Sequence, residues 1–211
     1  MSVRKRLLLS LFAAGLFTHE AAAQTADESA FITLGTQGGP IPNAVRSQPA
    51  NALVLNSGVY LVDVGDGAAG QLAAARIPLQ QVKGVFISHL HFDHTGGLAA
   101  LLGLRFQVNA PGVLTVYGPP GAKELVDGLV ASMKPGAEAG YGVPGEHNPN
   151  PAEMVSVVEI RDGAKMELEG FTVSAAENSH YSFPKGSEHD KRFDSLSFRF
   201  ERQCRKTREG R

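Results

Sequence analysis

The chain has 211 residues, 43% of them hydrophobic, and carries a formal net charge of −1 at pH 7. This length and composition are sufficient for one globular domain with a hydrophobic core. The nearly neutral balance lacks the basic excess of nucleic-acid-binding surfaces, so it argues against nucleic acid as a partner. The single cysteine, Cys204, excludes an internal disulfide.

The N-terminal segment 1–23 is typical of a secretory signal peptide. A basic region (Arg4–Arg6) precedes an apolar stretch from Leu7 to Phe17, and Ala21–Ala23 offers a cleavage site of small residues. Such a stretch is much shorter than the roughly 20 residues that span a bilayer. We therefore expect a periplasmic or secreted protein with no stable membrane span, and a retained membrane anchor is the alternative.

Apolar runs predict the first strands of the domain. We expect a strand that begins at Phe31, followed by a loop rich in Gly and Pro that extends to Pro49. Two further runs, Ala52–Leu55 and Val59–Val64, are separated by Asn56-Ser57-Gly58. This arrangement predicts a β-hairpin.

Two aspartates lie at the end of the second hairpin strand. A helix is expected at Ala68–Ala75, and Asp63 or Asp66 could cap it. Alternatively, these carboxylates could orient metal-binding histidines from behind, as the outer partners of metal ligands commonly do. The residues alone leave both roles open.

A dense group of metal-binding side chains follows the next predicted strand. The apolar run Gly84–Ser88 predicts a buried strand, and His89, His91, Asp93 and His94 come directly after it. Side chains at i and i+2 of an extended segment point to the same side, so His89 and His91 can bind one metal ion. Asp93 and His94, where the chain turns into a helix, could face a second ion. This donor set suits Zn²⁺ best, and Mn²⁺ or iron less well.

The residues after the motif predict helices and one strand. Thr95 is expected to cap a helix, because apolar residues recur from Leu98 at i, i+3 and i+4. A strand at Val113–Tyr117 and a helix at Lys123–Met133 then form a βα unit.

Residues 134–151 contain eight Gly or Pro in eighteen positions. We therefore expect a mobile loop there rather than a regular element, and long loops beside a site often act as lids. His147 in this loop is expected to be solvated, with a substrate contact as the alternative.

Strands are predicted again at Val155–Ile160, Phe171–Ala175 and Ser195–Phe200. His180 follows the second of these strands, as His89 follows its own strand, so it is the candidate for a third histidine of the same site. His189 has no preceding strand and is expected to be solvated.

The residues His89-Leu90-His91-Phe92-Asp93-His94-Thr95-Gly96-Gly97-Leu98 resemble the signature of the metallo-β-lactamase-fold hydrolases, and most closely their ribonuclease Z-like branch. Weaker matches in the same order are Leu34–Pro40, Leu61–Gly67 and Val116–Gly121. The resemblance extends from about Phe31 to Phe200. It implies an α/β fold, the αββα sandwich of that family.

The resemblance also implies roles for residues outside the motif. His180 lies where the family has its third histidine, and Asp63 lies where an aspartate supports the metal loop. The family continues after Ser195–Phe200 with a bridging aspartate and a later histidine, which no residue here matches. We therefore expect the second half of the sandwich to be incomplete and one apolar strand face to lack cover. The domain would occupy residues 24–201 and be followed by a basic tail, 202–211, that is not family sequence, as in a truncated or frame-shifted product.

These observations predict an exported, metal-dependent hydrolase. One or two zinc ions, with Mn²⁺ or iron as alternatives, would activate water, and Asp93 is the candidate for handling its proton. The expected substrates are small molecules with an ester, lactone, phosphodiester or β-lactam bond. A lactonase or β-lactamase of the same fold is the alternative enzyme, and an inactive metal-binding fragment is the alternative without activity.

Overall fold

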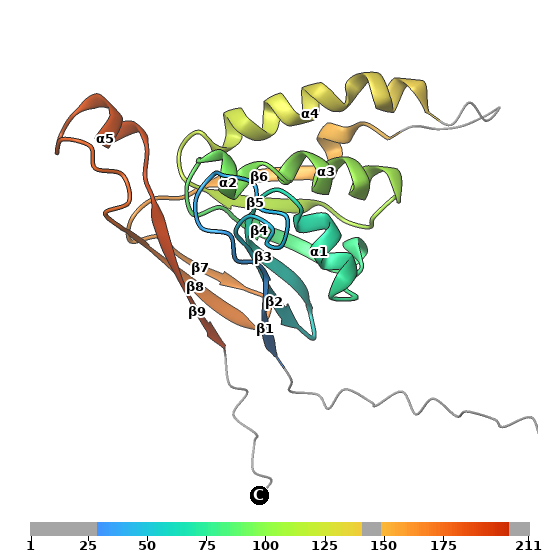
Figure 1. Ribbon diagram of the computed structural model, residues 1–211, viewed down its shortest axis with the longest axis horizontal. Helices are drawn as coiled ribbons and strands as arrows, with labels where there is room; N and C mark the ends of the chain where they lie inside the picture. The colour runs from blue at the N-terminus through green and yellow to red at the C-terminus, as the bar shows by residue number, and fades with distance from the viewer. Residues whose placement is uncertain (1–28, 141–148, 203–211) are drawn as a thin grey trace, which may run out of the picture.

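A computed structural model describes residues 29–140 and 149–202. In this part of the chain two β-sheets stack face to face, and helices cover the free face of the larger sheet (Figure 1). The expected signal peptide, His147 and the tail beyond Arg202 lie outside the described residues, so these expectations stay predictions.

The larger sheet has six strands in the spatial order β1-β2-β3-β4-β5-β6. Strands β1 to β3 are antiparallel to their neighbours, whereas β3 to β6 run parallel. The carboxyl ends of the parallel strands therefore lie at one edge of the sheet, where the histidine motif follows β4. The bounds of the strands are β1 Ala30–Gly35, β2 Ala50–Leu55, β3 Gly58–Val64, β4 Val82–Phe86, β5 Leu114–Gly118 and β6 Val155–Glu159.

Helices pack on one face of this sheet through an aliphatic core. Leu72, Leu98, Leu101 and Val126 are buried there against strand residues such as Val85. Burying a side chain of this size contributes about 1.5–3 kcal/mol, so this face is a main source of stability. The helices are α1 Ala68–Ala74, α2 Phe92–Thr95, α3 Leu98–Gln107 and α4 Ala122–Ala139, with 3₁₀ turns at Leu79–Gln81 and Pro151–Met154. A short helix, α5 Glu188–Arg192, lies between β8 and β9 and buries no residue, so it is not part of this layer.

The smaller sheet is antiparallel, in the order β7-β8-β9, and packs on the other face of the larger sheet. Its strands are β7 Lys165–Leu168, β8 Phe171–Glu177 and β9 Leu196–Arg202. Phe198 and Phe200 of β9 lie 5.5 and 5.3 Å, between ring centroids, from Phe86 of β4. The expectation of an uncovered apolar face on this strand is therefore wrong, because that face is the contact between the two sheets.

The outer face of the smaller sheet is polar on β9 and has no helical layer among residues 29–140 and 149–202 (Figure 1). Ser197, Arg199 and Glu201 are exposed there, and Arg199 pairs with Glu201 at 2.8 Å. The described layers are thus helix, sheet and sheet. This is the expected αββα sandwich with its second half incomplete.

Two local predictions are wrong, and one strand was not predicted. Helix α4 continues through Pro135 to Ala139, where Ala137 is buried, so packing outweighs the helix-breaking composition. Strand β7 was not predicted, since only Met166 and Leu168 in its four residues point inward. Thr95 ends α2 instead of capping α3, whose first turn follows Gly97 without a side-chain cap.

In the portion of the chain that the structure describes, none of the helices is both long enough and apolar enough to cross a membrane.

Candidate metal centre

Backbone hydrogen bonds hold the end of β4 between the two sheets. Ile87 N donates to Tyr117 O of β5 at 2.8 Å, and Leu196 N of β9 donates to Ser88 O at 2.8 Å. The residue that precedes His89 is therefore fixed from both sides.

Two glycines bring the motif against the end of β3. A Cβ atom at Gly65 would lie 2.3 Å from Asp93 O, and one at Gly97 would lie 2.2 Å from Gly65 O. Both distances are far below van der Waals contact, so only glycine permits this approach of the two backbones. Gly97 N also donates to Val64 O at 2.9 Å, which fixes the position of α2.

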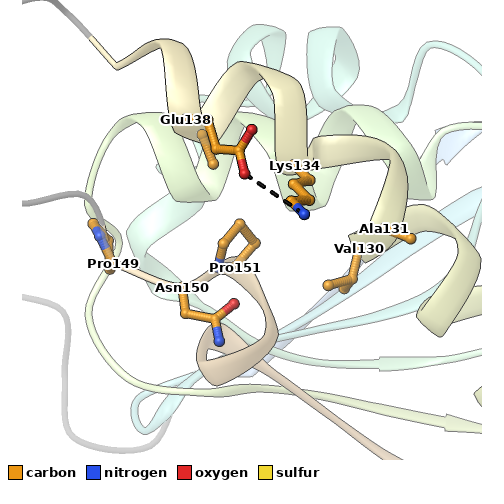
Figure 2. A pocket seen from close by; sticks show the side chains of 8 residues that line it. Val130, Ala131, Lys134, Glu138, Pro149, Asn150 and Pro151 are labelled. Carbon is orange, nitrogen blue, oxygen red and sulfur yellow. Dashed lines mark ion pairs between the residues drawn. The ribbon is translucent and has the colours of Figure 1, made fainter.

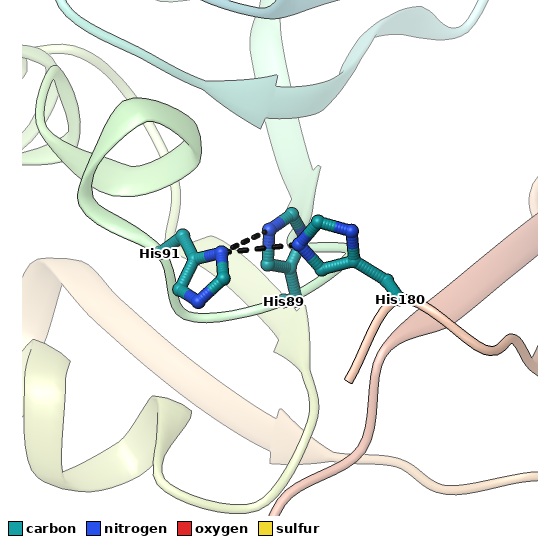
Figure 3. Close-up of side chains that lie close together, drawn as sticks. All are labelled: His89, His91 and His180. Carbon is teal, nitrogen blue, oxygen red and sulfur yellow. Dashed lines mark hydrogen bonds between the residues drawn. The ribbon is translucent and has the colours of Figure 1, made fainter. Parts of the chain in front are cut away.

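Three imidazole rings converge beside this edge. His89 and His91 follow β4, whereas His180 follows β8 of the smaller sheet, and Figure 3 shows the three rings pointing toward one another. His91 Nδ1 lies 3.1 Å from His89 Nε2 and 3.1 Å from His180 Nε2. The three ligand nitrogens all lie within 4.8 Å of one another. His89 is buried, and the other two rings face solvent.

This arrangement fits a metal ion of the zinc type. Nitrogens bound to one tetrahedral zinc at about 2.0–2.1 Å are separated by about 3.3 Å, close to the spacing observed here. Burial, together with the charges of His94 and His180, lowers the pKa of His89 to about 4. The ring is therefore neutral at pH 7, the state in which imidazole binds metals.

Asp93 and His94 lie next to the three histidines but do not belong to the converging group. The His94 ring is 4.1 Å from the His89 ring between centroids, and His94 Nε2 is 3.7 Å from Asp93 Oδ2. These two side chains offer two donors beside the three histidines, which is fewer than the first position has.

Asp63 and Ser88 hold the histidine motif in place through hydrogen bonds. Asp63 Oδ1 accepts the Ser88 N–H at 2.8 Å, and Asp63 Oδ2 accepts the Ser88 hydroxyl at 2.9 Å. Because that hydroxyl proton goes to the carboxylate, Nδ1–H of His89 donates to Ser88 Oγ at 3.0 Å. This leaves Nε2 of His89 without a proton and directed at the other two histidines.

Asp63 also orients the His94 ring and raises its pKa. The His94 Nδ1–H donates to Asp63 Oδ2 at 2.7 Å. Burial lowers the pKa of His94, but the hydrogen bond and charge of Asp63, together with the charge of Asp93, outweigh burial and raise it above 6.5. The two carboxylates thus stabilise the protonated form of His94 in the metal-free protein.

A pH-dependent contribution to stability follows for the metal-free protein. Because the folded pKa of His94 is raised, its stabilisation is complete below the unfolded value of 6.5 and is lost as pH rises through the folded value. We expect Asp63→Asn to lower the free energy of unfolding more at pH 6 than at pH 9. Urea denaturation of chelator-treated protein at both pH values measures the difference, and equal losses would contradict the assignment.

Two residues of this centre were not predicted. The sequence pattern identifies Ser88 only as the end of a strand. Its position directly before His89 was the signal that its hydroxyl could contact the His89 ring. Tyr181, directly after His180, accepts the Leu90 N–H on its hydroxyl at 3.1 Å. Burial raises the pKa of Tyr181, and the hydrogen bond from Leu90 partly offsets this, so the phenol stays neutral at pH 7.

The remaining expected residues lie apart from the three histidines. Asp66 is exposed, and no side chain caps α1, so the capping role of Asp66 is wrong. His189 is exposed on α5, as expected, and its ring contacts Phe183 at 5.5 Å between centroids.

A separate hollow of about 390 Å³ lies between α4 and the 3₁₀ turn at Pro151–Met154 (Figure 2). Lys134 and Glu138 form an ion pair of 3.7 Å in its wall, which is otherwise mostly apolar. None of its lining residues belongs to the histidine centre.

Comparisons with known structures identify the class of protein. The metallo-β-lactamase-fold protein YhfI of Bacillus subtilis aligns with a TM-score of 0.55 at 17% identity, covering 82% of this chain and 58% of that one. The short form of human tRNase Z aligns with a TM-score of 0.60 at 22% identity, covering 83% and 64%. The fold and the histidine cluster thus define a metallo-β-lactamase-fold protein.

The family is more specific than the fold. The chain belongs to the family described as Anti-Pycsar protein Apyc1, whose model matches residues 31–207. A ribonuclease Z of Mycobacterium marinum is 31% identical over 152 residues, which are 71% of this chain and 54% of the relative. The chain spans about half the length of the curated relatives it matches. The relatives support a hydrolase with resemblance to ribonuclease Z.

The expectation that nucleic acid is not a partner is wrong. It rested on the formal net charge and on the expected export, but a curated relative is named ribonuclease Z and a solved neighbour is named tRNase Z. A sum over the whole chain does not describe the charge beside a site, where phosphate groups are contacted.

Proposed function

We propose that this protein is an exported hydrolase of phosphodiester bonds that uses zinc held by His89, His91 and His180. The observation that carries the proposal is the convergence of three ring nitrogens from two separate segments within 4.8 Å. The names of the relatives support the phosphodiester class, because those proteins act on RNA. The N-terminal pattern of residues 1–23 supports export.

Each residue of the centre has a defined task in this proposal. When bound, zinc would supply a Lewis acid and a water of lowered pKa. His89 is neutral at pH 7 and is oriented by Ser88, so it presents a lone pair without first losing a proton. Asp93 is the residue that would accept the proton of the attacking water, since its carboxylate follows the ligand histidines in the motif and lies 3.7 Å from His94 Nε2.

The proposal includes one tightly bound ion rather than two. Three histidines serve the first position, whereas Asp93 and His94 are the donors beside it in the described residues. Two protein ligands hold a divalent ion weakly compared with three. Metal analysis after dialysis should therefore give one zinc per chain, and two retained ions would contradict this part.

A substrate panel tests the reaction. We expect zinc-dependent hydrolysis of bis(p-nitrophenyl) phosphate, a cyclic mononucleotide or an RNA oligonucleotide, and loss of that activity with EDTA and its return with zinc. A lactone and a β-lactam serve as controls, because they are the substrates of the alternative enzymes. Hydrolysis of only these controls would replace the phosphodiester proposal, and activity that survives chelation would overturn the metal centre.

Export is tested separately. We expect mature protein from the periplasm or medium to begin at Gln24, because cleavage should follow Ala23. Intact-mass spectrometry measures this, and soluble protein that retains residues 1–23 would contradict export without affecting the metal centre.

A further inference from the structure

Tyr181 lies against all three histidines. Its ring centroid is 5.7 Å from that of His89, 5.2 Å from that of His91 and 5.7 Å from that of His180. It meets the first two rings edge-on, at interplanar angles of 81° and 79°. The phenol ring therefore packs against the histidine cluster.

The hydroxyl of Tyr181 joins two segments that are far apart in the sequence. Leu90 N, between His89 and His91, donates to it at 3.1 Å. Tyr181 directly follows His180, so this hydrogen bond links the segment after β4 to the segment after β8. It joins the backbone of Leu90 to the side chain of Tyr181, next to all three histidines.

The Leu90 end of this hydrogen bond is held in place by another element. A Cβ atom at Gly121 would lie 2.7 Å from Leu90 Cδ1, so the Leu90 side chain packs closely on the start of α4. At the other end, the Tyr181 ring contacts Phe183 of its own segment at 5.1 Å between centroids. The hydrogen bond therefore ties the segment of His180 to a fixed position beside His89 and His91.

We infer that Tyr181 is a positioning residue that sets the separation of His180 from His89 and His91 and thereby the affinity of the centre for its metal ion. Tyr181 is not itself a ligand or a proton donor in this role. The inference rests on the proposed metal function of the three histidines.

The test compares zinc affinity in the full chain with Tyr181→Phe and a matched variant, Tyr117→Phe. Tyr117 loses the same hydroxyl, but its ring stacks on Phe86 in the core between the sheets, with centroids 4.7 Å apart. Competition with a chromophoric chelator gives the dissociation constant for zinc. We expect about tenfold weaker binding in Tyr181→Phe, the range seen for outer partners of metal ligands, and less than about threefold change in Tyr117→Phe.

Thermal unfolding with and without zinc separates positioning from general stability. If Tyr181→Phe lowers the melting temperature of the metal-free protein, the rise on adding zinc should still be smaller than in the unaltered chain, because that rise reports affinity. Equal affinity and an equal rise in both proteins would overturn the inference. Failure of the unaltered chain to bind zinc would instead overturn the proposed function on which it rests.

Discussion

Replacing His180 by alanine should weaken zinc binding by more than about a hundredfold and lower kcat/KM for a phosphodiester by at least about a thousandfold. Loss of an outer partner of a ligand already costs about 10–100-fold in affinity, and this change removes a ligand itself. His180 is exposed, so its truncation should leave the fold intact. Chelator competition, a hydrolysis assay and circular dichroism measure the three properties.

His189→Ala is the matched control, since it removes another exposed imidazole from the same part of the chain. Its zinc affinity and kcat/KM should stay within about threefold of the unaltered protein. If His180→Ala behaved like this control, the converging histidines would not be the metal centre.

Asp63→Ala should lower the free energy of unfolding by about 2–4 kcal/mol and also weaken zinc binding. The Asp63 carboxylate is buried and is the partner of the Ser88 N–H, the Ser88 hydroxyl and the His94 ring. Its removal leaves these groups without their acceptor, which is costly for buried donors. Alanine is also disfavoured at the left-handed backbone of this position, with φ 59°. Urea denaturation gives the stability, and chelator competition gives the affinity.

Asp66→Ala removes a carboxylate three residues away that is exposed and caps no helix. Its effect on the free energy of unfolding should remain within about 0.5 kcal/mol. Asp63→Asn separates charge from shape, because asparagine tolerates the left-handed region and keeps two hydrogen-bonding atoms. A loss in Asp63→Ala no larger than in Asp66→Ala would show that Asp63 does not support the centre.

The strands that carry the site could be predicted because the apolar residues of each run and the turn residues beside it indicate the same element. The run before His89 is apolar and contains β-branched residues. A buried strand was expected at Gly84–Ser88, and β4 spans Val82–Phe86, two residues earlier at each end. The hairpin of β2 and β3 followed from Asn56-Ser57-Gly58 in the same way. Proximity of His89 to His91 needed only the two-residue period of extended backbone.

The contacts across the molecule could not be read from local pattern. Ser88, Asp63 and Tyr181 act through partners that are 25 or 91 positions away in the sequence, and no local pattern reports such pairs. The same holds for α4, whose path beyond Met133 depends on the burial of Ala137. The position of His180 was expected from its place after a predicted strand and from family resemblance, whereas the hydrogen bond of the adjacent Tyr181 to Leu90 was not.

The origin of the three histidines in two different sheets gives a bound ion a mechanical role. His91 and His180 are separated by 89 positions, so a metal bound by both would cross-link the β4 and β8 segments much as a disulfide does. Chain-entropy arguments put the value of closing a loop of that length at on the order of 4–5 kcal/mol. The smaller sheet could then not detach from the larger one until the ion dissociates. Metal release would remove this link, and scarcity of metal would make the chain more open to proteolysis.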